Sequence, residues 1–293
     1  MRPSVVALGG GHGLAVALHA IREYAGLITA VVSVADDGGS SGRLRRDLDV
    51  PAPGDLRRCL VALATADGPW PAAFEHRFRA GELADHALGN LVLVGLAETL
   101  GDLIAALDEA GRLLGAAGRV LPATRGAVRM TARVGGERVT GQVAIAEAGR
   151  RQRIADVQLD PADPPATPAA LDAIAQADQI VIAPGSLYTS IAAVMCVPEI
   201  RRAVEHARGA VVQVANLETE NETVGHDGTD HLAVVRDHRG RVDAFLYDPS
   251  LGLAVDDAVV ARLGAKPVPA EIAAADGTRH EPLQLAKALA ALL

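Results

Sequence analysis

The residues best suited to chemistry lie in short glycine-rich segments, and the first is Gly9-Gly10-Gly11-His12-Gly13-Leu14. It follows an apolar run typical of a strand, Ser4–Leu8, and leads into a helical pattern. Glycines at such a turn let the backbone approach a phosphate, and the free N–H groups of the helix attract an anion. The segment matches neither a strict G-x-G-x-x-G, because Leu14 takes the place of the last glycine, nor a Walker A loop. A tight turn without a ligand is the alternative, and His12 could either donate to a phosphate or only cap the helix.

A second segment, Val34–Arg46, gathers two acids, two serines, three glycines and three arginines. It follows Leu27–Val34, whose near-continuous apolar run is typical of a strand buried on both faces. An acid at this distance from the first glycine loop is where a dinucleotide-binding unit holds a ribose hydroxyl. Asp36 or Asp37 could instead hold a divalent cation. We expect Arg43 to pair with a phosphate or with these acids.

Polar residues in three other segments are further candidates. Asp55 follows a Pro-Gly turn and could cap the next helix, and Asn90 lies in an apolar helix where its burial would demand hydrogen-bond partners. In Val181–Ser190 a Gly/Ser turn again links a strand to a helix, so its backbone donors predict a second anion cradle. Because no histidine is placed to activate Ser186, the turn does not indicate a serine hydrolase. Asn216 ends a later strand.

These segments require a frame of alternating strands and helices, which is the signature of parallel βαβ winding. The sequence therefore predicts an α/β fold, Rossmann-like and doubly wound, with a mostly parallel sheet in one domain over residues 1–293. A small antiparallel β insertion is predicted over 119–161, where Val128–Val134 and Val139–Ile145 flank Gly135-Gly136. Other strands are expected over Gln179–Ala183 and Ala210–Ala215, and helices over Leu14–Tyr24, near Asp55, Asp85, Asp102, Tyr188 and Glu199, and from Ala169 and Pro282.

The predicted topology brings the polar segments together. Two glycine-rich turns and one acidic Gly/Ser loop all follow the carboxyl ends of strands, where doubly wound sheets bind ligands at the switch point in strand order. The residues alone therefore predict one crevice for a phosphate-bearing ligand.

Composition narrows the classes of partner. The chain has 293 residues, 49% of them hydrophobic, so it can bury a sizeable core. Its formal net charge of −8 repels polyanions and only 2% of its residues are aromatic, so no nucleic acid partner is expected. No apolar run approaches the ~18 residues of a membrane span, and the start of the chain is unlike a signal peptide. We therefore predict a cytoplasmic protein with no membrane span.

The segments also resemble the YvcK/CofD family, and its YvcK branch, the gluconeogenesis factors, more closely. The resemblance rests above all on Ala-Asp-Asp-Gly-Gly-Ser-Ser-Gly-Arg-Leu-Arg at 35–45 and Pro-Gly-Ser-Leu-Tyr-Thr-Ser at 184–190, and it extends to Arg279-His280. It implies a Rossmann-like fold, a homodimer and binding of UDP-sugars such as UDP-N-acetylglucosamine. It also implies links to gluconeogenic growth, cell shape and peptidoglycan synthesis, with no catalytic residues and no required cofactor.

The CofD branch gives an alternative function. Its members transfer a phospholactyl group from a nucleoside-diphosphate-linked donor to a deazaflavin with magnesium, which Asp36 or Asp37 would hold here. An NAD-binding oxidoreductase is a third hypothesis, because the first loop and the following acid mimic the dinucleotide fingerprint, although no hydride-transfer partner is evident.

Candidate ligand-binding residues follow from both arguments. The resemblance carries family residues onto Gly10, Gly11, Gly13, Asp36, Asp37, Gly38, Ser40, Arg43, Asp55, Asn90, Gly185, Ser186, Tyr188, Thr189 and Asn216, and His12, Leu14, Gly39 and Arg279 complete the predicted site. Three departures from the family pattern stand out: His12 replaces the common Thr, the segment 216–223 replaces the usual Gln-Pro-Gly-Glu-Thr, and Glu281 follows Arg279-His280 in place of Asp.

Overall fold

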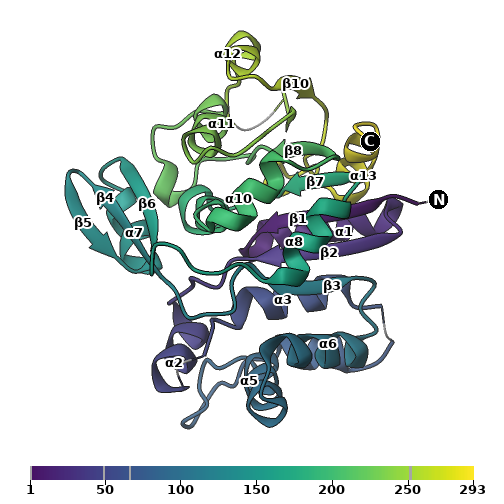
Figure 1. Ribbon diagram of the computed structural model, residues 1–293, viewed down its shortest axis with the longest axis vertical. Helices are drawn as coiled ribbons and strands as arrows, with labels where there is room; N and C mark the ends of the chain where they lie inside the picture. Colours follow the sequence, from purple (N-terminus) through teal and green to yellow (C-terminus); the bar gives the residue numbers. More distant parts are fainter. Residues whose placement is uncertain (1, 49, 66, 251–252) are drawn as a thin grey trace.

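A seven-stranded sheet forms the centre of the computed structural model, which describes residues 2–48, 50–65, 67–250 and 253–293 (Figure 1). Every strand pair in it is parallel, so the predicted α/β, Rossmann-like fold is confirmed. The strand order is β10-β9-β8-β7-β1-β2-β3. The bounds are β1 (Ser4–Gly9), β2 (Leu27–Val32), β3 (Arg119–Pro122), β7 (Gln179–Ile182), β8 (Ala210–Val214), β9 (Ala244–Tyr247) and β10 (Lys266–Pro269).

The strand order changes direction next to β1. From β1 the chain proceeds through β2 and β3 on one side, whereas β7 pairs with the other side of β1 and leads on to β8, β9 and β10. The central strands are buried almost throughout, which accounts for their continuous apolar sequences. The switch point therefore lies between β1 and β7, where parallel sheets open a crevice at their carboxyl ends.

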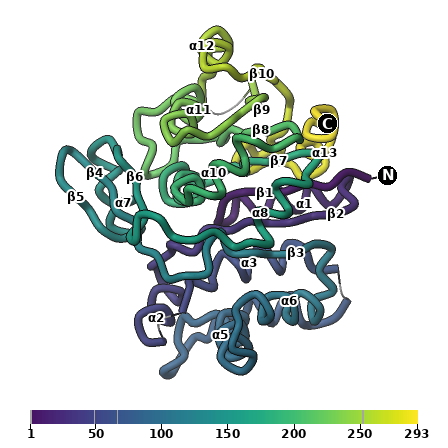
Figure 2. Tube along the Cα trace, viewed as in Figure 1, coloured from purple at the N-terminus to yellow at the C-terminus, as the bar shows by residue number. Residues whose placement is uncertain are grey.

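Helices cover the sheet and begin near its carboxyl edge. Helix α1 (Gly11–Tyr24) packs against α3 (Gly54–Leu63) and α13 (Pro282–Ala290), while α8 (Pro168–Gln176) packs against β1, β2 and β3. Figure 2 shows that the two ends of the chain lie on the same side of the molecule. The remaining helical elements are α4 (Trp70–Glu75), α5 (Leu88–Leu100), α6 (Leu103–Leu114), η1 (Leu187–Ala192), α9 (Ala193–Met195), α10 (Pro198–Glu205), η2 (Asn221–Thr223), α11 (Gly228–Asp237) and α12 (Asp257–Arg262).

The acidic Gly/Ser segment is not a loop throughout, contrary to the prediction. Its second half forms helix α2 (Gly39–Leu48), although Gly and Ser have low helix propensity. The side chain of Asp36 accepts a hydrogen bond from Gly38 N (2.9 Å), which fixes the turn before the helix, and the helix buries Leu44. Tertiary packing therefore overrides local propensity here.

The antiparallel insertion is smaller than predicted. Its sheet has the order β5-β4-β6, formed by β4 (Arg129–Val134), β5 (Glu137–Thr140) and β6 (Ile154–Asp160). The predicted start at Arg119 is corrected to Arg129, because Arg119–Pro122 pairs with β2 as the edge of the main sheet. The predicted strand Val139–Ile145 also ends early, since helix α7 (Gln142–Gly149) follows Gly141.

A carboxylate of the main domain fixes helix α7. Asp37 Oδ2 accepts from Gln142 N and Oδ1 accepts from Val143 N, both at 3.0 Å. These N–H groups begin the helix and would otherwise lack partners. Asp37 therefore ties the insertion to the loop after β2.

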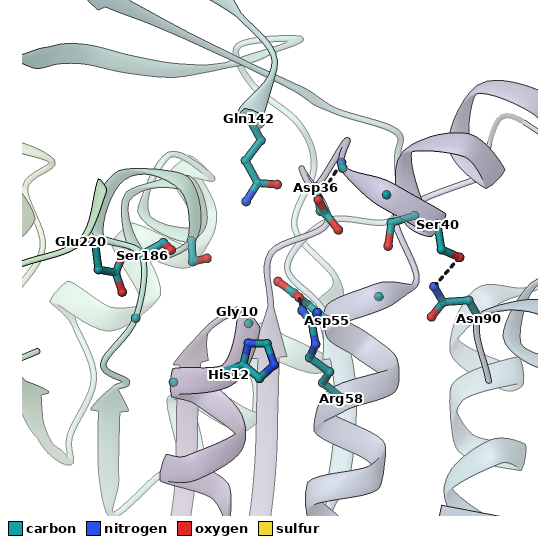
Figure 3. Close-up of a pocket in the computed structure, with 18 of the residues that line it drawn as sticks. Gly10, His12, Asp36, Ser40, Asp55, Arg58, Asn90, Gln142, Ser186 and Glu220 are labelled. Carbon is teal, nitrogen blue, oxygen red and sulfur yellow. Dashed lines mark hydrogen bonds and ion pairs between the residues drawn. The ribbon is translucent and has the colours of Figure 1, made fainter. Parts of the chain in front are cut away.

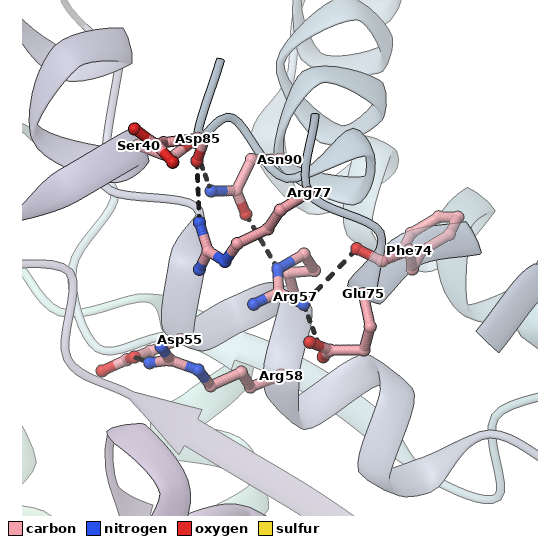
Figure 4. Close-up of polar contacts among 9 residues, drawn as sticks. All are labelled: Ser40, Asp55, Arg57, Arg58, Phe74, Glu75, Arg77, Asp85 and Asn90. Atoms are coloured by element: carbon pink, nitrogen blue, oxygen red, sulfur yellow. Dashed lines mark hydrogen bonds and ion pairs between the residues drawn. The ribbon is translucent and has the colours of Figure 1, made fainter. Parts of the chain in front are cut away.

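Arg57 links the helices beside the crevice (Figure 4). Its side chain is 1% exposed, with NH1 2.5 Å from Glu75 Oε1, and its Nε donates to Asn90 Oδ1 at 3.1 Å. Asn90 Nδ2 in turn donates to Ser40 Oγ at 3.0 Å. Asn90 is buried and has the hydrogen-bond partners that its burial would demand, and this network holds α2, α3, α4 and α5 together.

No helix of the described part of the chain is long and apolar enough to cross a membrane.

We expect Glu75→Ala to lower the free energy of unfolding by about 2 kcal/mol, because the buried Arg57 loses its carboxylate partner, although Glu75 itself is half-exposed. A matched control is Glu109→Ala, which breaks the exposed Arg112–Glu109 pair and should change the stability little. Urea unfolding measures both. Equal small losses would show that water reaches the Arg57 guanidinium.

Candidate functional site

A cavity of about 380 Å³ lies at the predicted switch point, where the starts of α1, α2 and α3 meet the turn after β7 (Figure 3). We refer to it as the main cavity. The predicted site residues that line it are Gly10, Gly11, His12, Gly13, Asp36, Gly38, Gly39, Ser40, Asp55, Asn90, Gly185 and Ser186.

The first glycine loop presents backbone to this cavity. Helix α1 has Gly10 as its N-cap residue and no side-chain cap. Gly13 is required for close packing, because a Cβ there would lie 1.9 Å from Pro184 O. Gly11 differs, since its φ is +64° and a Cβ there would meet no atom within 4 Å. The start of α1 is therefore open to the main cavity.

Two carboxyl groups lie on the adjoining wall. Asp36 and Asp55 face the main cavity from the loop after β2 and from the first turn of α3 (Figure 3). Burial raises the pKa of Asp36, and the nearby Asp55 charge raises it further. Asp55 Oδ1 is 2.8 Å from Arg58 NH1, so one of its oxygens is already paired.

Basic groups complete this side of the cavity. Arg58 and Arg77 both line it, and the sequence interpretation missed both. Arg58 lies one helical turn after Asp55, a spacing that could have revealed it. Burial lowers the pKa of His12, and the Arg58 charge lowers it further, so the imidazole is neutral at pH 7.

The turn after β7 is arranged differently from the prediction. Glu222 Oε1 accepts from Tyr188 N (2.8 Å) and from Thr189 N (3.3 Å), so a carboxylate of the protein already occupies the start of η1. In the predicted second anion cradle, these two backbone donors therefore already bind a side chain of the protein. Asn216 Oδ1 accepts from Gly185 N (2.8 Å) and its Nδ2 donates to Gly185 O (3.0 Å), which fixes the turn.

Several predicted residues lie outside the main cavity, and their part in binding stays a prediction. Leu14 is fully buried in the core, and Asp37 caps α7. Arg43 NH2 donates to Ala84 O at 2.7 Å instead of pairing with the acids. The Tyr188 hydroxyl is 2.9 Å from His226 Nε2.

Two further hollows adjoin the main cavity. One, of about 310 Å³, is lined by Val16, Leu217 and the predicted Asn216 and Arg279, and we call it the Arg279 cavity. The other, of about 580 Å³, lies against α7, contains the predicted Thr189, and is called the α7 groove.

Glu220 lines all three spaces. Burial, together with the neighbouring Glu222, raises the pKa of Glu220 to about 7. The sequence interpretation singled out its segment as a departure but did not assign Glu220 to the site. It also missed Ser41, Gly54, Gln142 and Ser190.

Comparisons of the sequence with a family model and with known proteins indicate the same family. The family model described as 2-phospho-L-lactate transferase CofD matches residues 5–284. A Mycobacterium tuberculosis protein is 47% identical over 252 residues, covering 81% of this chain and 73% of its own. The Bacillus subtilis protein named gluconeogenesis factor is 40% identical over 242 residues, covering 82% and 76%.

A solved structure extends the comparison to the fold. The crystal structure of a Bacillus halodurans protein superposes with a TM-score of 0.94 at 36% identity and covers 99% of this chain and 100% of that one. Together with the family match over nearly the whole chain, these likenesses show that the chain belongs to the CofD family and, within it, is related to the proteins named gluconeogenesis factors.

Proposed function

We propose that this protein binds a nucleoside diphosphate sugar of the UDP-N-acetylglucosamine type and acts as a regulatory protein, not an enzyme. The observation that supports it most is the meeting of three helix starts at one cavity. Helices α1, α2 and α3 begin at Gly11, Gly39 and Gly54, and all three glycines line the main cavity. Their N–H groups and dipoles favour a phosphate there.

The capping pattern supports a diphosphate in this place. Within the described residues, no side chain caps α1 or α3, whereas carboxylates of the protein already cap η1 and α7. The uncapped starts lie beside Arg58 and Arg77, which add positive charge. An anionic ligand would thus accept hydrogen bonds from the first N–H groups of α1 and α3, as Glu222 and Asp37 do at η1 and α7.

The Arg279 cavity gives room for the nucleoside. It adjoins the main cavity at His12, Gly13 and Gly185, and it combines apolar Val16 and Leu217 with polar Asn216 and Arg279. Small-molecule sites share this mixture of apolar walls and a few polar groups. The choice of UDP comes from the resemblance to the YvcK branch.

The regulatory part of the proposal comes from the relatives. Two of them, from Bacillus subtilis and Halalkalibacterium halodurans, are named gluconeogenesis factors. We propose a corresponding role in gluconeogenic growth and in cell shape through peptidoglycan synthesis, for a cytoplasmic homodimer.

Asp36 and Asp55 favour a second candidate, a CofD-like phospholactyl transferase. Two carboxylates facing one cavity offer oxygens of the kind that magnesium prefers, and a diphosphate would provide others. The fit is partial, since Asp36 Oδ1 already accepts from Gly38 N and Asp55 Oδ1 is paired with Arg58. When bound, magnesium would neutralise charge on a leaving phosphate.

Thermal unfolding with different ligands tests the proposed function. UDP-N-acetylglucosamine should stabilise the protein by about 2.7 kcal/mol at about 100 times its Kd, and UDP should also stabilise it. NAD and GDP serve as comparisons for the oxidoreductase and transferase hypotheses. A response to either of them with none to UDP or UDP-sugars would reject the proposal.

We predict that Gly11→Ala weakens UDP binding at least tenfold, about 1.4 kcal/mol, because the methyl group enters the space reserved for phosphate. Gly101→Ala is the matched control. Gly101 has a φ of +69° and open space around it, but it caps the far end of α5. Both variants should lower the free energy of unfolding by about 1–2 kcal/mol, because alanine disfavours a left-handed backbone conformation. Calorimetry showing equal affinities would mean that no phosphate lies at the α1 start.

Removal of magnesium separates the binder from the transferase. With EDTA the Kd for UDP-N-acetylglucosamine should change less than tenfold, about 1.4 kcal/mol, and no nucleotide sugar should be consumed. Strict magnesium dependence, with consumption of a nucleoside-diphosphate-linked donor in the presence of a deazaflavin, would establish the second candidate instead.

A further inference from the structure

The α7 groove runs between the insertion and the main domain. One face of α7 forms its first wall with Gln142, Val143, Ala146, Glu147 and Arg150. The opposite wall consists of the start of η1 and the segment 219–222. The insertion thus builds half of this space.

The groove is continuous with the main cavity. Asp36, Gln142, Ser186 and Glu220 line both. Figure 3 shows the Gln142 side chain pointing from the insertion into the space between Ser186 and Asp36. A group attached to a phosphate in the main cavity can therefore extend past these residues into the groove.

Carboxyl groups dominate the charge of the groove. Asp36, Glu147, Glu220 and Glu222 line it, against Arg150 as the one basic residue among its lining residues. Burial raises the pKa values of Asp36, Glu220 and Glu222, because the surroundings disfavour negative charge. A further anion in this space would also lose hydration and would be repelled by the acidic groups that are ionised.

Glu222 is a fixed part of the groove wall. It is 4% exposed, and its Oε1 accepts hydrogen bonds from Tyr188 N and Thr189 N. These contacts hold the carboxyl group between the groove and the start of η1.

The remaining lining suits a hydroxyl-rich group. Thr189, Thr219, Asn221 and Ser186 add hydroxyl and amide groups, and no aromatic residue is among the lining residues. These groups can form hydrogen bonds with the hydroxyls of a sugar ring, whereas a planar base would have no aromatic side chain to stack on.

We propose that the α7 groove holds the sugar of the ligand and selects an uncharged, hydroxyl-bearing sugar against one that carries a carboxylate. This proposal rests on the proposed function, in which the diphosphate lies in the main cavity. It gives the insertion a role in specificity.

Calorimetry at pH 8, with UDP, UDP-glucose and UDP-glucuronate, tests the proposal. The two sugars differ only in having a hydroxymethyl or a carboxylate group, and at this pH Glu220 is mostly ionised. We expect UDP-glucuronate to bind at least tenfold more weakly than UDP-glucose. Equal affinities for the two sugars would overturn the selectivity.

Variants locate the source of the selectivity. Glu220→Gln should reduce the ratio of the two affinities at least threefold, mainly by strengthening UDP-glucuronate binding. Glu137→Gln, on β5 of the same insertion and outside all three spaces, should leave the ratio unchanged. Equal effects of the two variants would mean that the acids of the groove do not face the sugar.

UDP alone separates the two proposals. If UDP fails to bind, the proposed function fails. If UDP and both sugars bind with one affinity, the diphosphate site stands and the groove proposal is overturned.

Discussion

Helices α1 and α3 begin at the carboxyl edge of the sheet, and in the part of the chain that the structure describes no side chain caps their first N–H groups. The start of a helix leaves N–H groups that need partners, and its dipole adds positive potential. Parallel winding places the start of α1 at this edge because α1 follows β1, and α3, which comes after β2 and α2, packs beside α1. The polar chemistry of the site follows from this constraint.

Carboxylates of the chain satisfy the same requirement at two neighbouring helices. Glu222 caps η1 and Asp37 caps α7, each through two backbone N–H groups. Both contacts bridge segments distant in sequence, so they also position the walls of the α7 groove. The protein thus contains two internal examples of the contact that we propose for a bound diphosphate.

The sequence predicted the parts of the site that depend on local pattern. The strands β1 and β2 and the glycine turns after β1 and β7 could be placed because continuous apolar runs and glycines identify buried strands and tight turns. Asn90 could be identified because a buried amide requires partners. The switch point followed from the alternation of strands and helices.

Tertiary contacts produced the features that the sequence did not predict. Glu222 caps the start of η1 from 34 residues away, and Gln142 lines the main cavity from helix α7, whose first N–H groups are held by Asp37. The Gly/Ser composition suggested a loop at 39–48, but packing of Leu44 forms a helix. Arg43 matched a family pattern, yet its guanidinium holds the Ala84 carbonyl. None of these contacts has a periodic sequence signal.

A diphosphate held by the uncapped starts of α1 and α3, together with the start of α2, is best sought in a crystal structure with UDP-glucose bound. We expect phosphate oxygens within hydrogen-bond distance, about 2.7–3.2 Å, of backbone N–H groups at the starts of these helices. Phosphates bound elsewhere, with the helix starts contacting water alone, would contradict it.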